Sequence, residues 1–359
     1  EVVQDASNVE YIGQIGGATV AVAIQGSYAY IGAGPRLIVL DISTPASPQV
    51  VGKTEPLPGL IYDVVVAGDY AYVADREGGL RVVSIADPVH PVEIGFYDTP
   101  GSAWGVVVED DYAYVADANA GLRVVNISNP TQPVEVGFYD TSGDAYSVAV
   151  ASGYAYVADW DSDLCVVNVS DPANPVLSTI RETPGWSHDV EISEGYLYVA
   201  DWNSGLRVMN LSDPAHPVEV GFYDTLGEAQ GVVVSGSYAY VADGFGGLRV
   251  VNISNPASPV ETSHLYISGY TAGVAISDSY AYVADSLHGL WVVNILDPAI
   301  PTQVGFYECL GSAYDVAVSG GYAYVAFHEG GLRVVNVVNP TSPVEVGFYN
   351  TTGYTNGVT

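Results

Sequence analysis

The sequence predicts an all-β fold, a single closed β-propeller with eight four-stranded blades. Three observations predict it: a 42-residue text that recurs along the chain, four short apolar runs in every copy, and a composition typical of strands and turns. The 359 residues include 28 Tyr and 40 Gly; tyrosine favours pleated strands and glycine favours turns. No stretch carries apolar residues at helical spacing over three turns, and none approaches the roughly 18 apolar residues of a membrane-spanning helix. We therefore expect no membrane insertion.

The repeat unit is 42 residues long. Its third copy, residues 100–141, reads PGSAWGVVVEDDYAYVADANAGLRVVNISNPTQPVEVGFYDT. Nearly the same text begins at Gly16, Pro58, Pro100, Ser142, Pro184, Leu226, Ser268 and Leu310. Four strands in a unit of about 40 residues is the size of one propeller blade. The eight full copies, from Gly16 to Thr351, therefore predict eight blades.

Each copy holds four apolar runs, named a, b, c and d in chain order. In the third copy these runs are Gly105–Glu109, Tyr112–Asp117, Leu122–Ile127 and Val134–Tyr139. A Gly, Asp or Ser turn joins a to b, and an Asp-x-x-x-Gly hairpin joins b to c. An Asn/Asp-Pro-x-x-Pro segment joins c to d, where proline ends strand pairing because it lacks a backbone donor.

Strands b and c are mostly apolar on both faces. In the third copy, Tyr112 and Tyr114 share one face of strand b, and the alanine and valine that follow them share the other. A sheet that is apolar on both sides must be covered on both sides, and blades around an axis cover each other. The tyrosine pair recurs in all eight copies, from Tyr28/Tyr30 to Tyr322/Tyr324, and we expect it to pack between blades.

The strings GLRVVNISNP and YAYVAD resemble the LVIVD-repeat family, whose copies are understood as propeller blades. The resemblance covers Gly16 to Thr351. It implies a bacterial or archaeal surface or secreted protein, and the start at Glu1 without a methionine resembles a processed chain. We therefore expect an extracellular or cell-surface location. The resemblance does not imply one activity, because a fold does not determine a function.

Two remnants flank the eight copies and divide the chain into residues 1–15, the propeller at 16–351, and residues 352–359. Val9–Ile15 matches strand d, and residues 352–359 match the start of strand a. Three interpretations stay open. The remnants are additional or frayed strands beside a closed ring, parts of a ninth blade in a longer protein, or strands that pair with another subunit. The last would make the protein a filament or array subunit.

Charge and cysteine content exclude several classes. The formal net charge is −32, with 41 acidic and 9 basic residues, so nucleic acid and anionic membrane surfaces are poor partners. The two cysteines, Cys165 and Cys309, lie in non-adjacent copies at different repeat positions, so we expect no disulfide between them.

Comparison of the eight copies separates constant from variable connections. Variable residues lie in the b–c hairpins and the d–a connections, which emerge at the same end of a four-stranded meander. One rim therefore carries individual loops, and loops on a rigid scaffold commonly bind ligands. The predicted ligand-binding residues are Trp104, Trp160, Trp186, His188, Trp202, Phe245 and Tyr314. Tyr62, Tyr146, Tyr270, His288, Trp291 and His328 lie on or beside the same rim.

Two interpretations of the aromatic rim stay open. Aromatic rings beside carboxylates, as at Trp160 with Asp161 and Asp163, suit a sugar ring or a peptide. Alternatively, these side chains plug the mouth of the channel.

Carboxylates recur at two repeat positions. Asp75, Asp117, Asp159, Asp201, Asp243 and Asp285 close strand b in six copies. Such a ring could attract Ca²⁺, but one residue per blade spreads the ligands apart, and we expect pairing across the hairpin with Arg81, Arg123, Arg207 and Arg249. Asp63, Asp189 and Asp315 share a position at the start of strand a, where we expect solvated residues of the channel mouth, with a channel cation site as the alternative.

Five sequons predict glycosylation at Asn126, Asn168, Asn210, Asn252 and Asn350; a turn role at strand ends is the alternative.

No catalytic motif is found, and the six histidines occupy scattered repeat positions. We expect no enzyme and no cofactor beyond a candidate Ca²⁺. The function that we predict is a structural assembly or adhesion module, which associates with itself or with another surface protein. A glycan- or peptide-binding module is the alternative, and a hydrolase or lyase with a channel-mouth metal is the third hypothesis.

Overall fold

The computed structural model describes residues 19–33, 35–41, 43, 49–160, 163–277, 279–285, 289–308, 313–327, 331–341 and 343–349. Within these residues the protein consists of eight four-stranded antiparallel sheets, here blades 1 to 8. The prediction of an all-β protein with eight four-stranded blades is confirmed. No helix in the described residues is long and apolar enough to span a membrane.

Each blade consists of four consecutive strands. Blade 1 contains β1 (Thr19–Gln25), β2 (Tyr28–Ala33), β3 (Arg36–Asp41) and β4 (Gln49–Lys53), and blade 2 contains β5 (Asp63–Ala67), β6 (Tyr70–Ala74), β7 (Leu80–Ser84) and β8 (Val92–Tyr97). Blade 3 contains β9 (Gly105–Glu109), β10 (Tyr112–Ala116), β11 (Leu122–Asn126) and β12 (Val134–Tyr139), and blade 4 contains β13 (Ala145–Ala151), β14 (Tyr154–Asp159), β15 (Leu164–Asn168) and β16 (Val176–Arg181).

The second half of the chain repeats this arrangement. Blade 5 contains β17 (Asp189–Ser193), β18 (Tyr196–Ala200), β19 (Leu206–Asn210) and β20 (Val218–Tyr223), and blade 6 contains β21 (Gly231–Ser235), β22 (Tyr238–Ala242), β23 (Leu248–Asn252) and β24 (Val260–Leu265). Blade 7 contains β25 (Thr271–Ser277), β26 (Tyr280–Asp285), β27 (Gly289–Asn294) and β28 (Thr302–Glu308), and blade 8 contains β29 (Ala313–Ser319), β30 (Tyr322–Phe327), β31 (Gly331–Asn336) and β32 (Val344–Tyr349).

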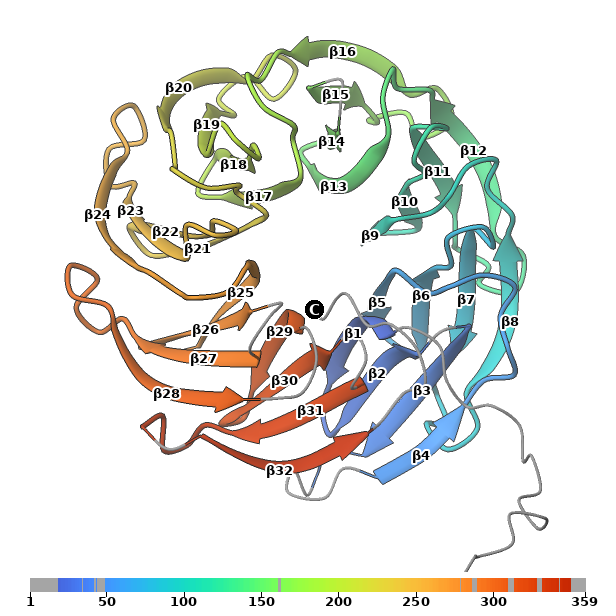
Figure 1. Cartoon of the computed structure of the whole chain (residues 1–359). Coiled ribbons are helices and arrows are strands. Elements are labelled where there is room, and N and C mark those ends of the chain that lie inside the picture. Colours follow the sequence, from blue (N-terminus) through green and yellow to red (C-terminus); the bar gives the residue numbers. More distant parts are fainter. Residues whose placement is uncertain are drawn as a thin grey trace, which may run out of the picture.

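The blades form a ring around a central opening (Figure 1). The first strand of each blade lies innermost and the fourth lies outermost (Figure 1). Blade 1 lies beside blade 8, where β1 contacts β30. The terminal remnants lie outside the described residues.

Apolar side chains fill the space between neighbouring blades. Tyr72 of blade 2, for example, packs against Ala113 and Val115 of blade 3. Tyr114 of blade 3 packs in turn against Ala155 and Val157 of blade 4. The second tyrosine of each pair is almost fully buried, so the predicted packing of the tyrosines between blades is confirmed.

A glycine in the fourth strand permits close approach between blades at the outer edge. A Cβ atom on Gly95 of β8 would lie 2.2 Å from the carbonyl oxygen of Pro130, in the c–d connection of the next blade. Gly137 has the same relation to Pro172, at 2.3 Å. The repeated Val-Gly-Phe-Tyr text therefore encodes a contact between blades.

The outermost strands are irregular. The pairing of β7 with β8 shifts register between Val82 and Val83, and the third and fourth strands of the other blades show the same irregularity. Such bulges increase local twist and are found where an edge strand is protected from further pairing.

The predicted strand bounds are close to those observed. β10 and β11 each end one residue earlier than the apolar text predicts, at Ala116 and Asn126. Asp117 leaves the strand because it begins the hairpin, in which its N–H donates to the carbonyl of Gly121 at 2.7 Å.

Candidate functional site

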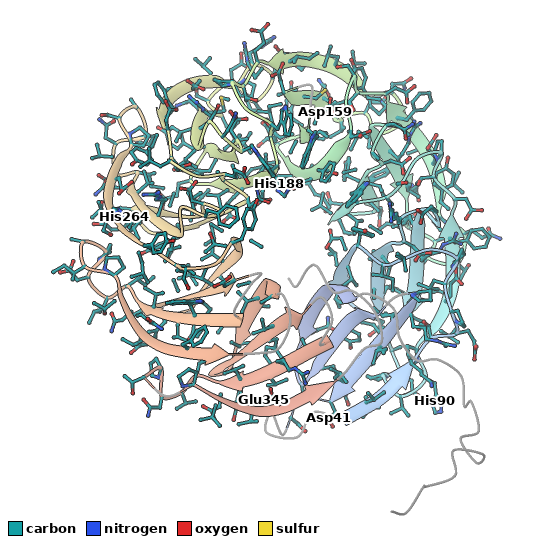
Figure 2. The ribbon with its side chains drawn as sticks, viewed as in Figure 1. Asp41, His90, Asp159, His188, His264 and Glu345 are labelled. Carbon is teal, nitrogen blue, oxygen red and sulfur yellow. The ribbon has the colours of Figure 1, made fainter. Side chains whose placement is uncertain are left out.

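Four aromatic residues occupy one position in four successive blades. Tyr62, Trp104, Tyr146 and His188 stand at equivalent places at the inner strand, at or just before its start. Figure 2 shows His188 at the inner side of the ring, beside the central opening. The equivalent residues of blades 6 and 7 are Gln230 and Ala272.

The b–c hairpins bring further aromatic residues to the same rim. Trp202 follows Asp201 and adopts a left-handed backbone conformation with φ of 44°, as Ala118 does at the same position in blade 3. The Trp202 carbonyl accepts a hydrogen bond of 2.8 Å from Ala229 of the next blade. The hairpin is thereby held against its neighbour, which positions the tryptophan on the rim.

The rings of these residues form one continuous cluster, here called the aromatic cluster, which consists of Tyr62, Trp104, Tyr146, Trp160, Trp186, His188 and Trp202. Tyr62 meets Trp104 edge to face, with ring centroids 4.3 Å apart. Trp104 stacks on Tyr146 at 4.7 Å with an interplanar angle of 21°. Tyr146 continues to Trp160 at 4.6 Å.

Trp160 is the centre of the aromatic cluster. Its ring centroid lies 5.5 Å from that of Trp186, 5.4 Å from that of His188 and 5.5 Å from that of Trp202. Most members are half-buried, but 46% of Trp186 is exposed. The aromatic cluster is thus a packed surface that spans blades 2 to 5, with Trp186 as its most exposed member.

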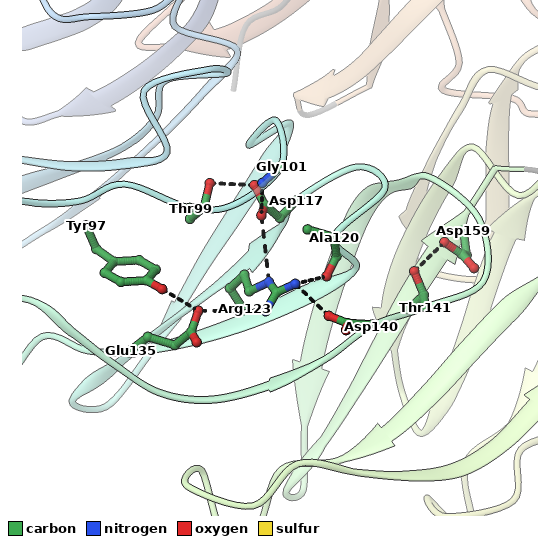
Figure 3. Close-up of polar contacts among 10 residues, drawn as sticks. All are labelled: Tyr97, Thr99, Gly101, Asp117, Ala120, Arg123, Glu135, Asp140, Thr141 and Asp159. Atoms are coloured by element: carbon green, nitrogen blue, oxygen red, sulfur yellow. Dashed lines mark hydrogen bonds and ion pairs between the residues drawn. The ribbon is translucent and has the colours of Figure 1, made fainter.

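The aspartates that close strand b anchor the loops of this rim. In blade 3, Asp117 accepts hydrogen bonds from the Thr99 hydroxyl at 2.5 Å and the Gly101 N–H at 2.8 Å (Figure 3). Arg123 Nε lies 3.7 Å from the same carboxylate, and Arg123 also donates to Asp140 at 2.6 Å (Figure 3). Each aspartate therefore ties the d–a connection to the b–c hairpin.

The predicted pairing of these aspartates with arginines is confirmed in blades 2, 3, 5 and 6. Burial raises the pKa of Asp75 to about 7 and that of Asp117 above its ordinary value. In the part of the chain that the structure describes, no three His, Cys, Asp or Glu side chains lie together as a metal site would require.

Two further aspartates, Asp63 and Asp189, join neighbouring blades at the inner strands. Asp63 accepts hydrogen bonds from its own strand, at Val64, and from Val106 of blade 3 at 2.9 Å. Asp189 accepts from Val190 at 2.9 Å and from Val232 of blade 6 at 3.2 Å. The expectation of solvated mouth residues needs a correction for these two aspartates. Each is half-buried, and backbone N–H groups of its own strand and of the next inner strand bind its carboxylate. The Asp315 side chain lies outside the described part.

Burial raises the pKa of Asp63 to about 6, although hydrogen bonds from two backbone N–H groups oppose this shift. Burial also raises the pKa of Asp189.

A cavity of about 590 Å³ lies in the central channel beside the aromatic cluster. One side carries Tyr62, Tyr146, His188, Asp189 and Glu191. The remaining lining consists mainly of small and aliphatic residues of the next three inner strands, β21, β25 and β29. The cavity therefore has a polar, aromatic wall and an apolar wall.

His188 donates one hydrogen bond on the polar wall and can accept another. Its Nδ1 lies 2.8 Å from the carbonyl oxygen of Gln230, and a carbonyl can only accept, so Nδ1 carries the proton. Burial lowers the pKa of His188, which favours the neutral ring. The neutral tautomer leaves Nε2 with a free lone pair.

The model of the LVIVD repeat matches eight segments: 16–55, 58–99, 100–141, 142–183, 184–225, 226–265, 268–309 and 310–351. The chain belongs to the LVIVD-repeat family. A comparison with curated proteins finds no match.

Solved structures share the fold of this LVIVD-repeat propeller at low sequence identity. The computationally designed Ika8 protein is 11% identical with a TM-score of 0.75, and the match covers 89% of this chain and 96% of that one. Saccharomyces cerevisiae Sqt1 is 10% identical with a TM-score of 0.72 (87% and 93% covered), and BamB from Moraxella catarrhalis is 12% identical with a TM-score of 0.67 (87% and 92% covered). These likenesses support the propeller fold alone.

The LVIVD-repeat propeller brings together five of the seven predicted ligand-binding residues: Trp104, Trp160, Trp186, His188 and Trp202. Phe245 instead pairs with Tyr270 at 5.0 Å, and 63% of Phe245 is exposed. The side chain of Tyr314, and all of His288 and His328, lie outside the described part. Ligand binding by these residues stays a prediction.

One aromatic residue assigned to the rim has another place. Trp291 lies within β27, where its Nε1 donates to Asp285 at 3.0 Å and its ring packs on Phe306 at 5.0 Å. Trp291 occupies the repeat position of Arg81 and Arg123, which bind the aspartate that closes strand b. Comparison of the copies could therefore have indicated that Trp291 binds Asp285 in the same way.

Arg76, Gln230 and Glu191 of the site were not singled out from the sequence. Arg76 holds the repeat position of Trp160 and Trp202, and its guanidinium lies 5.3 Å from the Tyr62 ring centroid and 5.5 Å from that of Trp104. Gln230 and Glu191 line the cavity.

The sequon asparagines end the third strands of blades 3 to 6. Asn126 Oδ1 accepts from the N–H of Ser128 at 3.1 Å and from its hydroxyl at 2.6 Å. Asn168, Asn210 and Asn252 accept from the equivalent serine N–H groups. The expected turn chemistry is therefore present; glycosylation stays a prediction, and Asn350 lies outside the described part.

Proposed function

We propose that this LVIVD-repeat propeller is a non-enzymatic adhesion module, extracellular or at a cell surface, that holds a protein partner on the rim of the aromatic cluster. The observation that carries the proposal is the continuous contact of seven aromatic rings across blades 2 to 5, centred on Trp160. Tryptophan and tyrosine are enriched at the residues that dominate binding energy in protein interfaces.

The packing of the rings supports a protein partner over a glycan. A sugar ring stacks on an open aromatic face, but Trp104 and Tyr146 use faces on each other at 4.7 Å. A partner that contacts ring edges and the gaps between rings suits this surface better. Trp186, 46% exposed, is the residue that favours a glycan as the second candidate.

An extracellular or surface location is part of the proposal. The net charge of −32 keeps such a chain soluble and attracts basic partners at a distance. The absence of a catalytic motif in the sequence supports a binding role. Self-association through the terminal remnants concerns residues outside the described part, and we retain it as a separate hypothesis for assembly.

Binding to an immobilised peptide library and to a glycan array tests the proposal. We expect the intact chain to retain peptides, and the double variant Trp186→Ala with Trp202→Ala to lose at least tenfold in affinity. Phe222→Ala is the matched control, because Phe222 is an exposed aromatic residue on the outer strand of the same blade. Selective retention of glycans would replace the protein partner with a sugar. Equal binding by the wild type and the double variant would overturn the role of the rim.

A further inference from the structure

We propose that the cavity beside the aromatic cluster binds an organic cation. Its ammonium or guanidinium group lies against Asp189 and Glu191, and its hydrocarbon part lies along β21, β25 and β29. The cavity shares Tyr62, Tyr146 and His188 with the proposed binding face, but a free cation can occupy it whether or not a protein binds the rim.

Two carboxylates give the cavity its negative wall. Asp189 and Glu191 are two residues apart on β17, so their side chains share one face of the strand, and both line the cavity. Burial raises the pKa of each, and the charge of Asp189 adds to the rise at Glu191. A bound cation would stabilise both carboxylates in their charged form.

One further group on this wall can accept a hydrogen bond. His188 Nδ1 donates to the backbone carbonyl oxygen of Gln230, which leaves Nε2 as an acceptor. No lysine or arginine is among the described residues that line the cavity. An ammonium or guanidinium group donates on all its N–H bonds, so it matches the two carboxylates and His188 Nε2.

Aromatic rings complete the polar wall. Tyr62 and Tyr146 line the cavity. Tyr146 packs between Trp104 and Trp160, and the Arg76 guanidinium lies 5.3 Å from the centroid of Tyr62. The two tyrosines therefore add apolar contact area for the hydrocarbon part, and Asp189 and Glu191 supply the charge.

Small residues at the inner strands of blades 6 and 7 leave the space for the ligand. Blades 2 to 5 place Tyr, Trp, Tyr and His at the inner-strand position, whereas blade 7 has Ala272 there. Gly231 and Gly273 add no side chain to the same wall. A volume of about 590 Å³ lies within the range of roughly 300–1,000 Å³ found for small-molecule sites.

The arrangement fits an organic cation better than a metal ion. Asp189 already binds the N–H groups of Val190 and Val232, and Glu191 accepts from the N–H of Val234. Ca²⁺ needs about six to eight oxygen ligands, and the described residues contain no cluster of three acidic or histidine side chains suited to a metal.

Calorimetric titration of the full chain with n-pentylamine tests the inference, with 1-pentanol as the uncharged probe of the same length. We expect n-pentylamine to bind and 1-pentanol to bind at least tenfold more weakly. Glu191→Gln removes one charge and should weaken the binding of n-pentylamine at least fivefold. Ala272→Tyr introduces the residue that blades 2 and 4 carry at this position and should abolish binding by filling the cavity.

The matched control is Trp186→Ala, because Trp186 is not among the described residues that line the cavity. It should weaken binding of the proposed partner on the rim and leave the affinity for n-pentylamine unchanged, so the two proposals fail separately. A Gly-Gly-Lys-Gly-Gly peptide with blocked termini distinguishes the source of the cation. Tighter binding of the peptide assigns the group to a partner's side chain, and tighter binding of n-pentylamine assigns it to a free amine. An affinity for n-pentylamine equal to that for 1-pentanol, or unchanged in both cavity variants, would overturn the inference.

Discussion

The carboxylate of Asp63 accepts a hydrogen bond of 2.9 Å from the backbone N–H of Val106, across the boundary between blades 2 and 3. Three blades further on, Asp189 makes the equivalent bond to Val232. Inner strands have one edge without a neighbouring strand, and these aspartates satisfy part of that edge. The cost is a partly buried carboxylate in each case.

This cost predicts a pH dependence of stability. The folded pKa of Asp63 is raised to about 6 from 3.8, so between about pH 4 and pH 6 the folded state holds a proton that the unfolded state has lost. The contribution of Asp63 to stability should therefore fall as the pH rises through this window. Melting temperatures at pH 4, 5, 6 and 7 check this, and the Asp63→Asn variant should show a shallower decline.

Asp69→Asn is the control for Asp63, because it removes an exposed charge from the same blade. It should leave the slope of the wild type in place. An Asp63→Asn protein with the same pH profile as the wild type would contradict the assignment.

The buried pair in blade 3 predicts a large effect of removing one partner. Asp117→Ala would leave Arg123, which is 5% exposed, without its buried carboxylate and would release Thr99 and Gly101. Breaking a buried pair costs about 3–5 kcal/mol. Chemical denaturation should show a loss of this size, and Asp140→Ala, which removes the exposed partner of Arg123, should cost much less. Equal losses would contradict the role of Asp117.

The contact between outer strand and next blade predicts that Gly95→Ala destabilises the ring. The added Cβ would lie 2.2 Å from the Pro130 carbonyl oxygen, so backbone must move. Overpacking of this kind costs about 1–3 kcal/mol, which denaturation can measure. Gly231→Ala is the comparison, because its nearest contact would be an ordinary 3.6 Å.

Burial of Cys165 predicts resistance to alkylation. The thiol is 2% exposed and burial raises its pKa to about 12, so little reactive thiolate exists at pH 8. Mass spectrometry of the peptide that contains Cys165 should find no iodoacetamide adduct in the native protein and full modification in guanidinium. Rapid modification of the native chain would show that blade 4 opens far more easily than its packing indicates.

The sequence predicted the fold well because the information is repeated. The 42-residue period predicted the number of blades. The apolar residues on both faces of strands b and c predicted the packing between blades. The same logic placed Trp104 and Trp160 on one rim, since their connections emerge at the same end of a meander. Their mutual contact through Tyr146 depends on side-chain size across blades, which no single repeat contains.

The remaining errors have physical causes. Asp63 and Asp189 are half-buried at the inner strands, because the unpaired N–H groups of the next inner strand bind their carboxylates. The separation of Phe245 from the aromatic cluster reflects Gly244, which stands where blades 4 and 5 carry tryptophan and so interrupts the line of rings. The space of the cavity depends on small residues of two blades, Gly231, Ala272 and Gly273.

The aromatic cluster covers blades 2 to 5, whereas small residues line the channel in blades 6 and 7. A ring of eight near-identical units would otherwise offer a partner eight equivalent orientations about its axis. The difference between the aromatic and the aliphatic blades makes one direction around the ring distinct from the others. A partner that docks on the aromatic side is held off the axis and faces one direction, so the rotational symmetry of the repeats is lost at the surface where binding takes place.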